Sequence, residues 1–244
     1  MNYTVHRGTK TPIVFLHGWG GDASNFLPCA QHLQKCGHTT ICIDLWGFGD
    51  SPLPPEHYGI FDYAQDVANL LDKIGYLEYY IVGHSFGGRI AILLCGDKSL
   101  AKNFVIGKVV LVDSAGIKPR RGVKYRCKVA LYKLKKKWGW DISKDGSSDY
   151  QALPISFRPV FVRVVNTHLN QYVPNIQAST LLVWGGKDRD TPLWMAKYLQ
   201  KKIKDSGLVV FEDAGHWSFV HKPLAFALIL QNFFESVDTE KCHA

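Results

Sequence analysis

Ser85 stands in the segment Gly83-His84-Ser85-Phe86-Gly87, between an apolar run at 79–82 and a second apolar segment at 88–94. The first run predicts a buried strand and the second a helix, so the serine lies where a strand turns sharply into a helix. Such a turn projects the hydroxyl outward, and the two glycines remove side chains that would collide there. Ser85 is therefore a candidate nucleophile. The alternative interpretation is a glycine-rich turn with an unreactive serine.

Two later segments supply the partners that such a serine needs. A hydroxyl is a weak nucleophile until a base takes its proton and a third group orients that base. The apolar run at 180–184 predicts a strand, and Asp188 follows it in a loop. The run at 208–211 predicts another strand, which His216 follows. Along the chain the serine comes first, then the aspartate, then the histidine. This order is known for three such groups that act together at one end of a parallel sheet.

Two other carboxylates compete with Asp188 for the role of the acid. Asp190 lies two residues later in the same loop, and Asp113 follows the apolar run at 109–112. Both also stand just beyond the carboxyl end of a predicted strand, where parallel sheets bind their ligands. The residues alone leave the three open.

His216 is distinguished from the other histidines only by its position. The chain has ten histidines, and any one of them more often packs or faces solvent than acts as a base. His84 is expected to pack beside the turn, and His17 to brace the loop that it begins. Arg89, one helical turn after Ser85, is expected to pair with a nearby carboxylate.

Five motifs in order along the chain carry a resemblance to the α/β-hydrolase family, in its lid-bearing form. The sequence is similar to the family over nearly its whole length, and it resembles small carboxylesterases with an H-G-W-G segment. The motifs are the serine turn, His17-Gly18-Trp19-Gly20-Gly21 after the run at 12–16, Asp44-Leu45-Trp46-Gly47-Phe48-Gly49-Asp50-Ser51 after the run at 40–43, the loop 184–192, and Gly215-His216.

This resemblance implies a role for each candidate. Ser85 is the nucleophile, His216 the general base and then acid, and Asp188 the carboxylate that fixes the imidazole tautomer. The family's W-G-x-x-D spacing favours Asp188 over the competing acids. The resemblance also implies an oxyanion hole formed by the backbone N–H groups of Trp19 and Phe86, which would hold the negative oxygen of a tetrahedral intermediate.

The expected fold class is α/β, a mostly parallel sheet flanked by helices, as in the α/β-hydrolase fold. Residues 1–114 and 179–244 are assigned to the core, and residues 115–178 to a helical lid insertion. Only about ten residues precede the run at 12–16, so the amino-terminal edge of the sheet is expected to be shortened. Helical segments are expected at 22–36, 61–75, 86–96, 193–204 and 222–236.

The insertion carries much of the positive charge. Ten of the 29 Lys and Arg residues lie between Lys118 and Lys137, with no acid among them. Apolar residues recur between them at helical spacing, which predicts an amphipathic basic helix. Three interpretations stand: a solvated lid face whose apolar side covers the site, a surface that attracts anionic lipid or acyl substrates, and, last, a nucleic-acid surface, for which no reader motif is present.

The second half of the insertion and the residue after His216 suggest a substrate pocket. Five apolar residues fit a helix that packs inward: Phe157, Val160, Phe161, Val164 and Val165. Arg158 and Arg163 interrupt it and would either meet a substrate carboxylate or pair with acids and solvent. Trp217 resembles the pocket aromatic of hydrolases that cleave carbon–carbon bonds of ring-fission products. The segment at 17–21 departs from the H-G-x-G-P-G pattern of that group.

Composition sets the remaining bounds. The chain has 244 residues, 46% of them hydrophobic, which fits one α/β domain with an insertion. No metal-ligand spacing and no glycine-rich phosphate loop occurs, so no cofactor and no metal are expected. The six cysteines form no C-x-x-C pair, and neither a signal-type stretch nor a membrane-spanning run is present. A cytoplasmic protein with free thiols is expected, its oligomeric state left open.

The expected function is hydrolysis of an ester of a small to medium apolar acyl group through an acyl-enzyme on Ser85, with a thioester or an amide as lower-ranked alternatives to the ester. Two alternatives remain. One is a carbon–carbon bond hydrolase acting on ring-fission dienoates. The other is a receptor on the same fold that binds a ligand and turns it over slowly or not at all.

Overall fold

The computed structural model describes residues 1–120, 138 and 148–236 of the chain. The basic helix predicted between Lys118 and Lys137 lies almost entirely outside these ranges. Its association with anionic lipid therefore stays a prediction, as does the cytoplasmic location. Among the described helices, none combines the length and the apolar character needed to cross a bilayer.

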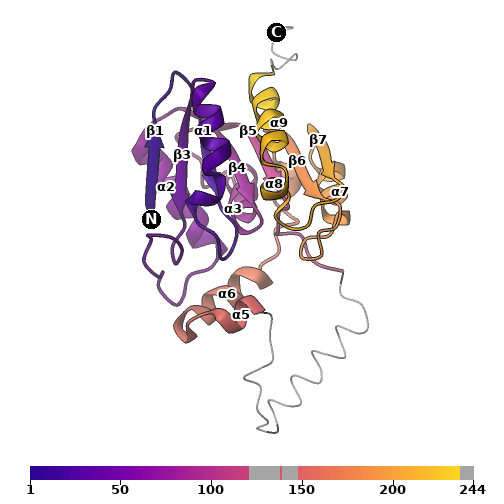
Figure 1. The fold of residues 1–244 in the computed structure, drawn as a ribbon. Coiled ribbons are helices and arrows are strands. Elements are labelled where there is room, and N and C mark those ends of the chain that lie inside the picture. Colours follow the sequence, from indigo (N-terminus) through magenta and orange to yellow (C-terminus); the bar gives the residue numbers. More distant parts are fainter. Residues whose placement is uncertain (121–137, 139–147, 237–244) are drawn as a thin grey trace.

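Seven strands form one sheet through the middle of the molecule (Figure 1). Their spatial order is β1-β3-β2-β4-β5-β6-β7, and all neighbours are parallel except β1 and β3. Most inner strands are buried on both faces, which explains their continuous apolar runs. The strands are β1 (Asn2–His6), β2 (Lys10–Leu16), β3 (His38–Asp44), β4 (Glu78–His84), β5 (Val105–Val112), β6 (Ser179–Gly185) and β7 (Ser206–Phe211).

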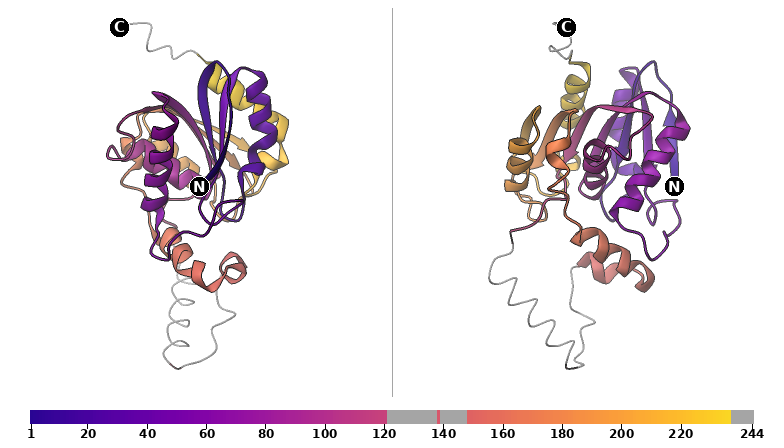
Figure 2. Two further views of the ribbon diagram at one scale, coloured as in Figure 1. Left: turned by 90° about the vertical axis from the view of Figure 1, so that its left-hand side faces the viewer. Right: turned by 180° about the vertical axis from the view of Figure 1, so that it is seen from behind.

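Helices cover both faces of the sheet, as expected from the sequence (Figure 2). One face packs against α1 (Leu27–Lys35), α8 (Ser218–His221) and α9 (Pro223–Glu235), with the short 3-10 helix η1 (Ala23–Phe26) leading into α1. The other face packs against α2 (Ile60–Ile74), α3 (Phe86–Gly96) and α7 (Trp194–Lys202). The sheet is therefore the middle layer of three.

Helix α2 shows how the sequence fixes these elements. Its buried residues recur every three or four positions from Ile60 to Leu71, which gives one apolar stripe toward the sheet. The Asp62 carboxylate accepts a hydrogen bond from the Gly59 N–H and so caps the start of the helix. Gly75 ends it in a left-handed conformation with φ of 89°, which glycine adopts without strain.

The amino-terminal edge carries a single antiparallel strand. β1 pairs with β3 in a register that places Asn2 opposite Asp44 and His6 opposite Thr40. The sequence gives little sign of this strand because its residues are mostly exposed and only Val5 is partly buried. The edge is short, as expected, but one more strand is present than the apolar runs predict.

The segment between β5 and β6 contains α5 (Ser148–Ala152), α6 (Arg158–Asn166) and the 3-10 helices η2 (Ile155–Phe157) and η3 (Val173–Asn175). Helices α5 and α6 lie beyond one end of the sheet (Figures 1 and 2). The two ends of the segment are joined, because the Leu169 N–H donates to the Gly116 carbonyl at 2.8 Å and the Lys118 N–H to Asn170 Oδ1 at 3.0 Å. The chain thus leaves and rejoins the core at one place.

The inward-facing residues of this segment are mostly those predicted. Phe157, Val160 and Val164 are buried, and the Phe161 ring contacts Trp19. The prediction was wrong for Val165, which is 36% exposed. Phe161 and Val165 lie one turn apart at the edge of the stripe formed by Val160 and Val164, and this edge is half-buried at Phe161 and exposed at Val165.

Candidate active site

Ser85 occupies the turn between β4 and α3. Its φ of 47° lies in the left-handed region, which costs a non-glycine residue about 1–3 kcal/mol and persists only when the surroundings enforce it. They do so here through the backbone. The Ser85 N–H donates to the Val112 carbonyl at 3.0 Å, and the Ser85 carbonyl accepts from the N–H groups of Ala115 and Arg89.

The glycines of the turn are required by close packing. A Cβ on Gly87 would lie 2.1 Å from the Leu16 carbonyl oxygen, and one on Gly83 would lie 2.7 Å from the Gly87 carbonyl oxygen. This proximity lets the Gly87 N–H donate to the His17 carbonyl at 3.0 Å. The serine turn is thereby fastened to the loop that follows β2.

The structure brings Ser85, His216 and Asp188 into one hydrogen-bonded row. His216 Nε2 lies 2.9 Å from Ser85 Oγ, and His216 Nδ1 lies 2.9 Å from Asp188 Oδ2. An ionised carboxylate only accepts, so Nδ1 carries the proton and Nε2 presents a lone pair to the serine hydroxyl. These three side chains follow β4, β7 and β6, whose carboxyl ends lie at one rim of the sheet.

Electrostatics in this row favour a basic imidazole. Burial lowers the pKa of His216, but the hydrogen bond that His216 donates to Asp188 and the charges of Asp188, Asp113 and Asp190 outweigh it and raise the pKa above the ordinary value. Burial raises the pKa of Asp188, but the hydrogen bonds that it accepts from His216 and Thr191 outweigh burial. The pKa of Asp188 is therefore below its ordinary value, and the carboxyl stays ionised. The His216 imidazole and the Asp188 carboxylate therefore each favour the charged form of the other.

Thr191 is a residue of this site that the sequence reasoning missed. Its N–H donates to Asp188 Oδ1 at 3.0 Å, and its hydroxyl lies 2.7 Å from Asp188 Oδ2 and 3.3 Å from His216 Nδ1. The Asp190 N–H donates to the same Oδ1 at 2.8 Å. An aspartate followed closely by a hydroxyl residue in a loop is typical of such side-chain-to-backbone turns, and this signal was available in the sequence.

The two competing acids occupy other places. Asp190 is exposed, and only its backbone N–H contacts the Asp188 carboxylate. Asp113 is fully buried, and its oxygens accept from the Gly185 N–H at 2.7 Å and from the N–H and hydroxyl of Ser218. Burial raises the pKa of Asp113 to about 7. Of the three candidates, Asp188 is the one hydrogen-bonded to the imidazole.

His17 braces the loop after β2, as expected. Its Nε2 accepts from the Leu45 N–H at 3.0 Å, so its Nδ1 carries the hydrogen and donates to the Gly18 carbonyl at 2.8 Å. Burial lowers the pKa of His17, which favours this neutral form. The peptide that leads to the Trp19 N–H is thereby held.

Two backbone N–H groups stand beside the serine turn. Phe86 is the first residue of α3, so the helix offers its N–H no internal acceptor. Within the described part of the chain, neither this group nor the Trp19 N–H donates to a protein acceptor. The two side chains also touch, with ring centroids 5.2 Å apart. This arrangement is compatible with an oxyanion hole.

His84 packs beside the turn, also as expected, and joins it to the base. His84 Nε2 donates to the His216 carbonyl at 2.8 Å, and burial lowers the pKa of His84 to about 3, which keeps it neutral. Trp217 lies against the His84 ring at 4.6 Å between centroids, and it also contacts Phe219. The Trp217 ring also lies beside Gly21, where an added Cβ would be 3.3 Å from it.

Trp19 is the centre of an aromatic cluster between the core and α6. Its ring stacks on Phe157 at 5.2 Å and meets Phe161, Phe48 and Phe86 edge-on at about the same separation. Such contacts contribute beyond their buried area. The cluster places an apolar wall beside the Trp19 and Phe86 N–H groups.

Arg89 corrects one expectation. It has no carboxylate partner in the described structure and instead donates to the carbonyls of Thr167 at 2.6 Å and Val165 at 3.5 Å, at the end of α6. The guanidinium is buried, which lowers its pKa to about 10. Because the last carbonyls of a helix lack internal donors, a cation satisfies them well. Arg89 therefore ties α6 to the core.

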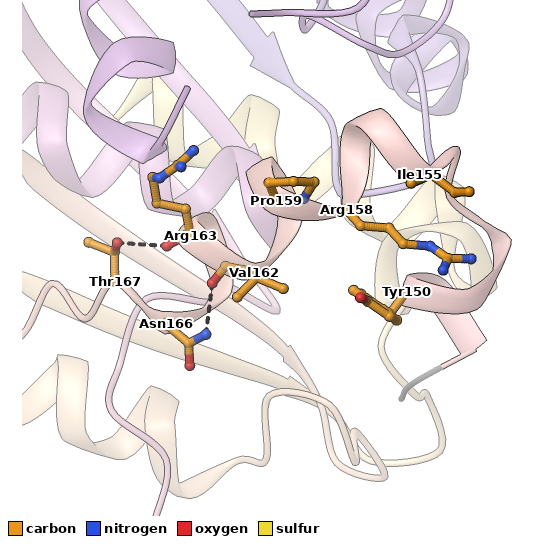
Figure 3. A pocket seen from close by; sticks show the side chains of 8 residues that line it. All are labelled: Tyr150, Ile155, Arg158, Pro159, Val162, Arg163, Asn166 and Thr167. Atoms are coloured by element: carbon orange, nitrogen blue, oxygen red, sulfur yellow. Dashed lines mark hydrogen bonds between the residues drawn. The ribbon is translucent and has the colours of Figure 1, made fainter. Parts of the chain in front are cut away.

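Arg158 and Arg163 also bind carbonyls. Arg158 donates to Leu153 and Gln151, and Arg163 donates to Glu56 and Tyr58 at 2.9 Å. Both line a groove of about 780 Å³ on α6, and Figure 3 shows their side chains diverging on either side of Pro159 and Val162. Neither Ser85 nor His216 lines this groove. The structure therefore places both arginines along this groove, which Ser85 does not line.

One group of side chains has the composition of a metal site. Ligand atoms of Asp188, Asp190 and His216 lie within 4.8 Å of one another. The hydrogen bonds already described account for this grouping, because Asp188 and His216 bind each other and His216 Nε2 faces Ser85. The third member of the group, Asp190, is exposed to solvent.

Comparison with known proteins gives consistent matches. The sequence profile of the alpha/beta hydrolase family matches residues 13–227. The AB hydrolase superfamily protein YisY of Bacillus subtilis is 26% identical, over 94% of this chain and 93% of that protein. The 2-hydroxy-6-oxononadienedioate/2-hydroxy-6-oxononatrienedioate hydrolase of Comamonas testosteroni is 27% identical, over 89% and 86%.

Solved structures agree on the fold. An esterase from Exiguobacterium antarcticum superposes with a TM-score of 0.74 at 22% identity, covering 96% of both chains. The order of strands, the helices on both faces and the family profile over most of the sequence together confirm the expected fold class. The chain belongs to the alpha/beta hydrolase family.

Proposed function

We propose that the protein is a serine hydrolase that cleaves a carboxylic ester through an acyl-enzyme on Ser85, without a cofactor. The observation that carries this proposal is the row in which His216 lies 2.9 Å from both Ser85 Oγ and Asp188 Oδ2. A neutral imidazole whose proton is fixed on Nδ1 presents its lone pair to the hydroxyl, which is the arrangement that activates a serine.

The reaction follows from this geometry. His216 Nε2 takes the hydroxyl proton while Ser85 Oγ bonds to the carbonyl carbon, and the N–H groups of Trp19 and Phe86 hold the oxygen that becomes negative. The imidazolium, stabilised by Asp188, then protonates the leaving alcohol as the carbon–oxygen bond breaks. Water, deprotonated by the same nitrogen, attacks the acyl-enzyme, and the acid is released with Ser85 restored.

The acyl group proposed is apolar and of small to medium size. The aromatic cluster around Trp19 supports this class, because Phe86 and Phe157 offer rings and no charges beside the two N–H donors. Thioesters and amides have the same reacting carbonyl and are the next classes to examine. We also propose residues 115–178 as a lid on a core of residues 1–114 and 179–244, since α6 packs on Trp19.

The test uses p-nitrophenyl esters of graded acyl length and a fluorophosphonate probe. Ser85→Ala should abolish turnover and labelling while circular dichroism and melting stay those of the parent protein. Unchanged turnover in Ser85→Ala would remove this serine from the mechanism. Folded parent protein that the probe does not label would instead indicate the receptor role.

A carbon–carbon bond hydrolase is the second candidate. Its support is the similarity to the Comamonas hydrolase. Against it, Arg158 and Arg163 both donate to backbone carbonyls, and Ser85 does not line the groove that the two arginines share. The ester screen should therefore include a ring-fission dienoate, and a preference for the dienoate over every ester would replace the ester proposal.

A further inference from the structure

We propose that Asp113 is a positioning residue for the proposed reaction, because its single carboxylate holds together the two loops that carry Asp188 and His216. This inference rests on the proposed function. It assigns Asp113 no contact with substrate. Its role is to keep the acid and the base at hydrogen-bonding distance.

The carboxylate adds a side-chain tie between two loops that already share backbone hydrogen bonds, from the Gly186 N–H to the Phe211 carbonyl and from the Lys187 N–H to the Ala214 carbonyl. Asp113 Oδ1 accepts from the Gly185 N–H at 2.7 Å, where β6 ends, three residues before Asp188. Asp113 Oδ2 accepts from the Ser218 N–H at 3.1 Å and the Ser218 hydroxyl at 2.5 Å, two residues after His216. Both oxygens are acceptors for backbone N–H groups, which only a carboxylate provides in this shape.

The Asp113 backbone adds two further ties. Its N–H donates to the Val183 carbonyl at 3.0 Å, and its carbonyl lies 2.9 Å from the Thr191 hydroxyl, the same hydroxyl that touches Asp188. The residue itself is strained, with φ of 42°, and Ser85 is the other non-glycine residue with positive φ in the described chain. The two strained residues are neighbours, since Ser85 bonds the carbonyl of the residue before Asp113.

Burial supports a specific role for this carboxylate. Asp113 is completely buried, and within the described residues no Lys or Arg pairs with it. A buried carboxylate without a cation is costly unless hydrogen bonds compensate it. All the compensation here comes from the loops of Asp188 and His216. Removing the carboxylate would leave the buried N–H groups of Gly185 and Ser218 without acceptors.

Asp113 also acts on His216 through charge. The charged and titratable groups that face the imidazole are Asp188, Asp113, Asp190 and His84. The Asp113 carboxylate raises the pKa of His216, without touching it. A purely structural residue would leave that pKa unchanged, so the pH profile distinguishes the two roles.

The experiment compares Asp113→Asn with Asp205→Asn, a matched control that also binds a serine hydroxyl, Ser179, but at the opposite end of β6. An asparagine must turn its NH₂ toward one of the two N–H donors and displace one loop. We expect Asp113→Asn to lower kcat by roughly 100-fold with KM nearly unchanged. The ascending limb of kcat/KM should move to lower pH, and Asp205→Asn should match the parent.

A double variant sharpens this test. If Asp113 acts through the acid and the base, Asp113→Asn should add little to the loss already caused by Asp188→Asn. Unchanged kcat in folded Asp113→Asn, or full additivity in the double variant, would overturn the proposal. Loss of turnover only on Ser85→Ala, with Asp113→Asn active, would leave the proposed function standing and this inference refuted.

If Asp113→Asn does not fold, Ser218→Ala is the variant to measure in its place. It removes the hydroxyl that binds Asp113 and keeps the Ser218 N–H bond. We expect kcat to fall several-fold at constant KM, with melting close to that of the parent. An unchanged kcat in this variant would overturn the proposal equally.

Discussion

The His84 ring donates to the backbone carbonyl of His216 across 2.8 Å, so the residue before Ser85 holds the backbone of the proposed base. Burial and the hydrogen bond at Nε2 both restrain the His84 ring. Its Nδ1 faces Gly18, whose added Cβ would lie 2.4 Å from that nitrogen. The loop that carries the Trp19 N–H is therefore packed against a ring that is bound on its other side.

Gly18→Ala should displace this loop and not the histidine. The Trp19 N–H would move away from the developing oxyanion, and kcat should fall on the order of 100- to 1000-fold with KM little changed. Gly207→Ala is the control, because the nearest atom to its Cβ would be 3.7 Å away in β6. Steady-state kinetics on a p-nitrophenyl ester measure both. Full activity of a folded Gly18→Ala protein would contradict the assignment of the Trp19 N–H.

Asp188→Asn and Asp190→Asn separate the two acids of one loop. Asparagine at 188 leaves the size unchanged but lets the imidazole take the wrong tautomer, so kcat should fall by roughly 10⁴-fold. Asp190 is exposed and contacts the site through its backbone N–H, which the substitution keeps. The kcat of Asp190→Asn should therefore stay near that of the parent. A large loss in Asp190→Asn with little loss in Asp188→Asn would assign the role of the acid to Asp190 instead.

The pH dependence of kcat/KM should reflect His216. The base must be neutral, and its pKa is raised above the ordinary 6.5, so activity should rise with pH through a midpoint above that value. Asp188→Asn removes the raising charge and should move the midpoint downward. In stability, the protonated imidazole favours the folded state below the unfolded pKa, and this contribution is lost as pH rises through the folded pKa. A midpoint at or below 6.5 in the parent would contradict the assigned contacts.

Arg89→Met should loosen α6 without unfolding the core. The carbonyls of Thr167 and Val165 would lose their buried donor, which costs about 1–3 kcal/mol. Arg89→Lys should recover part of this, since an ammonium is charged but lacks the planar fork that reaches two carbonyls. Denaturant unfolding measures the loss, and hydrogen exchange locates it. Equal protection of α6 in Arg89→Met and parent would show that other contacts hold this helix.

The positions of Ser85, Asp188 and His216 were predictable because each follows an apolar run that ends at the same rim of the sheet. Their mutual distances needed the structure, since 131 residues separate the serine from the histidine. The turn from Asp188 to Thr191 was visible in the sequence. The contact of the Thr191 hydroxyl with His216 and the bonds of Asp113 to Gly185 and Ser218 were not, because sequence patterns give no register between loops that are far apart in the chain.

The partner of Arg89 was mispredicted for a related reason. A charged residue in a sequence suggests an oppositely charged partner, but the ends of helices also carry partial charge that no residue type reveals. β1 was missed because an exposed edge strand shows no apolar run. The errors at Arg89 and at β1 both concern interactions of the backbone, which the pattern of side chains along the sequence does not reveal.

The hydrogen bond from the Leu169 N–H to the Gly116 carbonyl closes the base of the segment that connects β5 to β6, two strands that pair directly. Because the segment leaves and returns at adjacent points, its exchange would leave the pairing of these strands intact. Its contacts with the core include Trp19 and Arg89, so a replacement segment must fit both residues. On the proposed function, a chimera spliced at this junction with the corresponding segment of another family member should acquire the donor's substrate range while Ser85, Asp188 and His216 keep their positions.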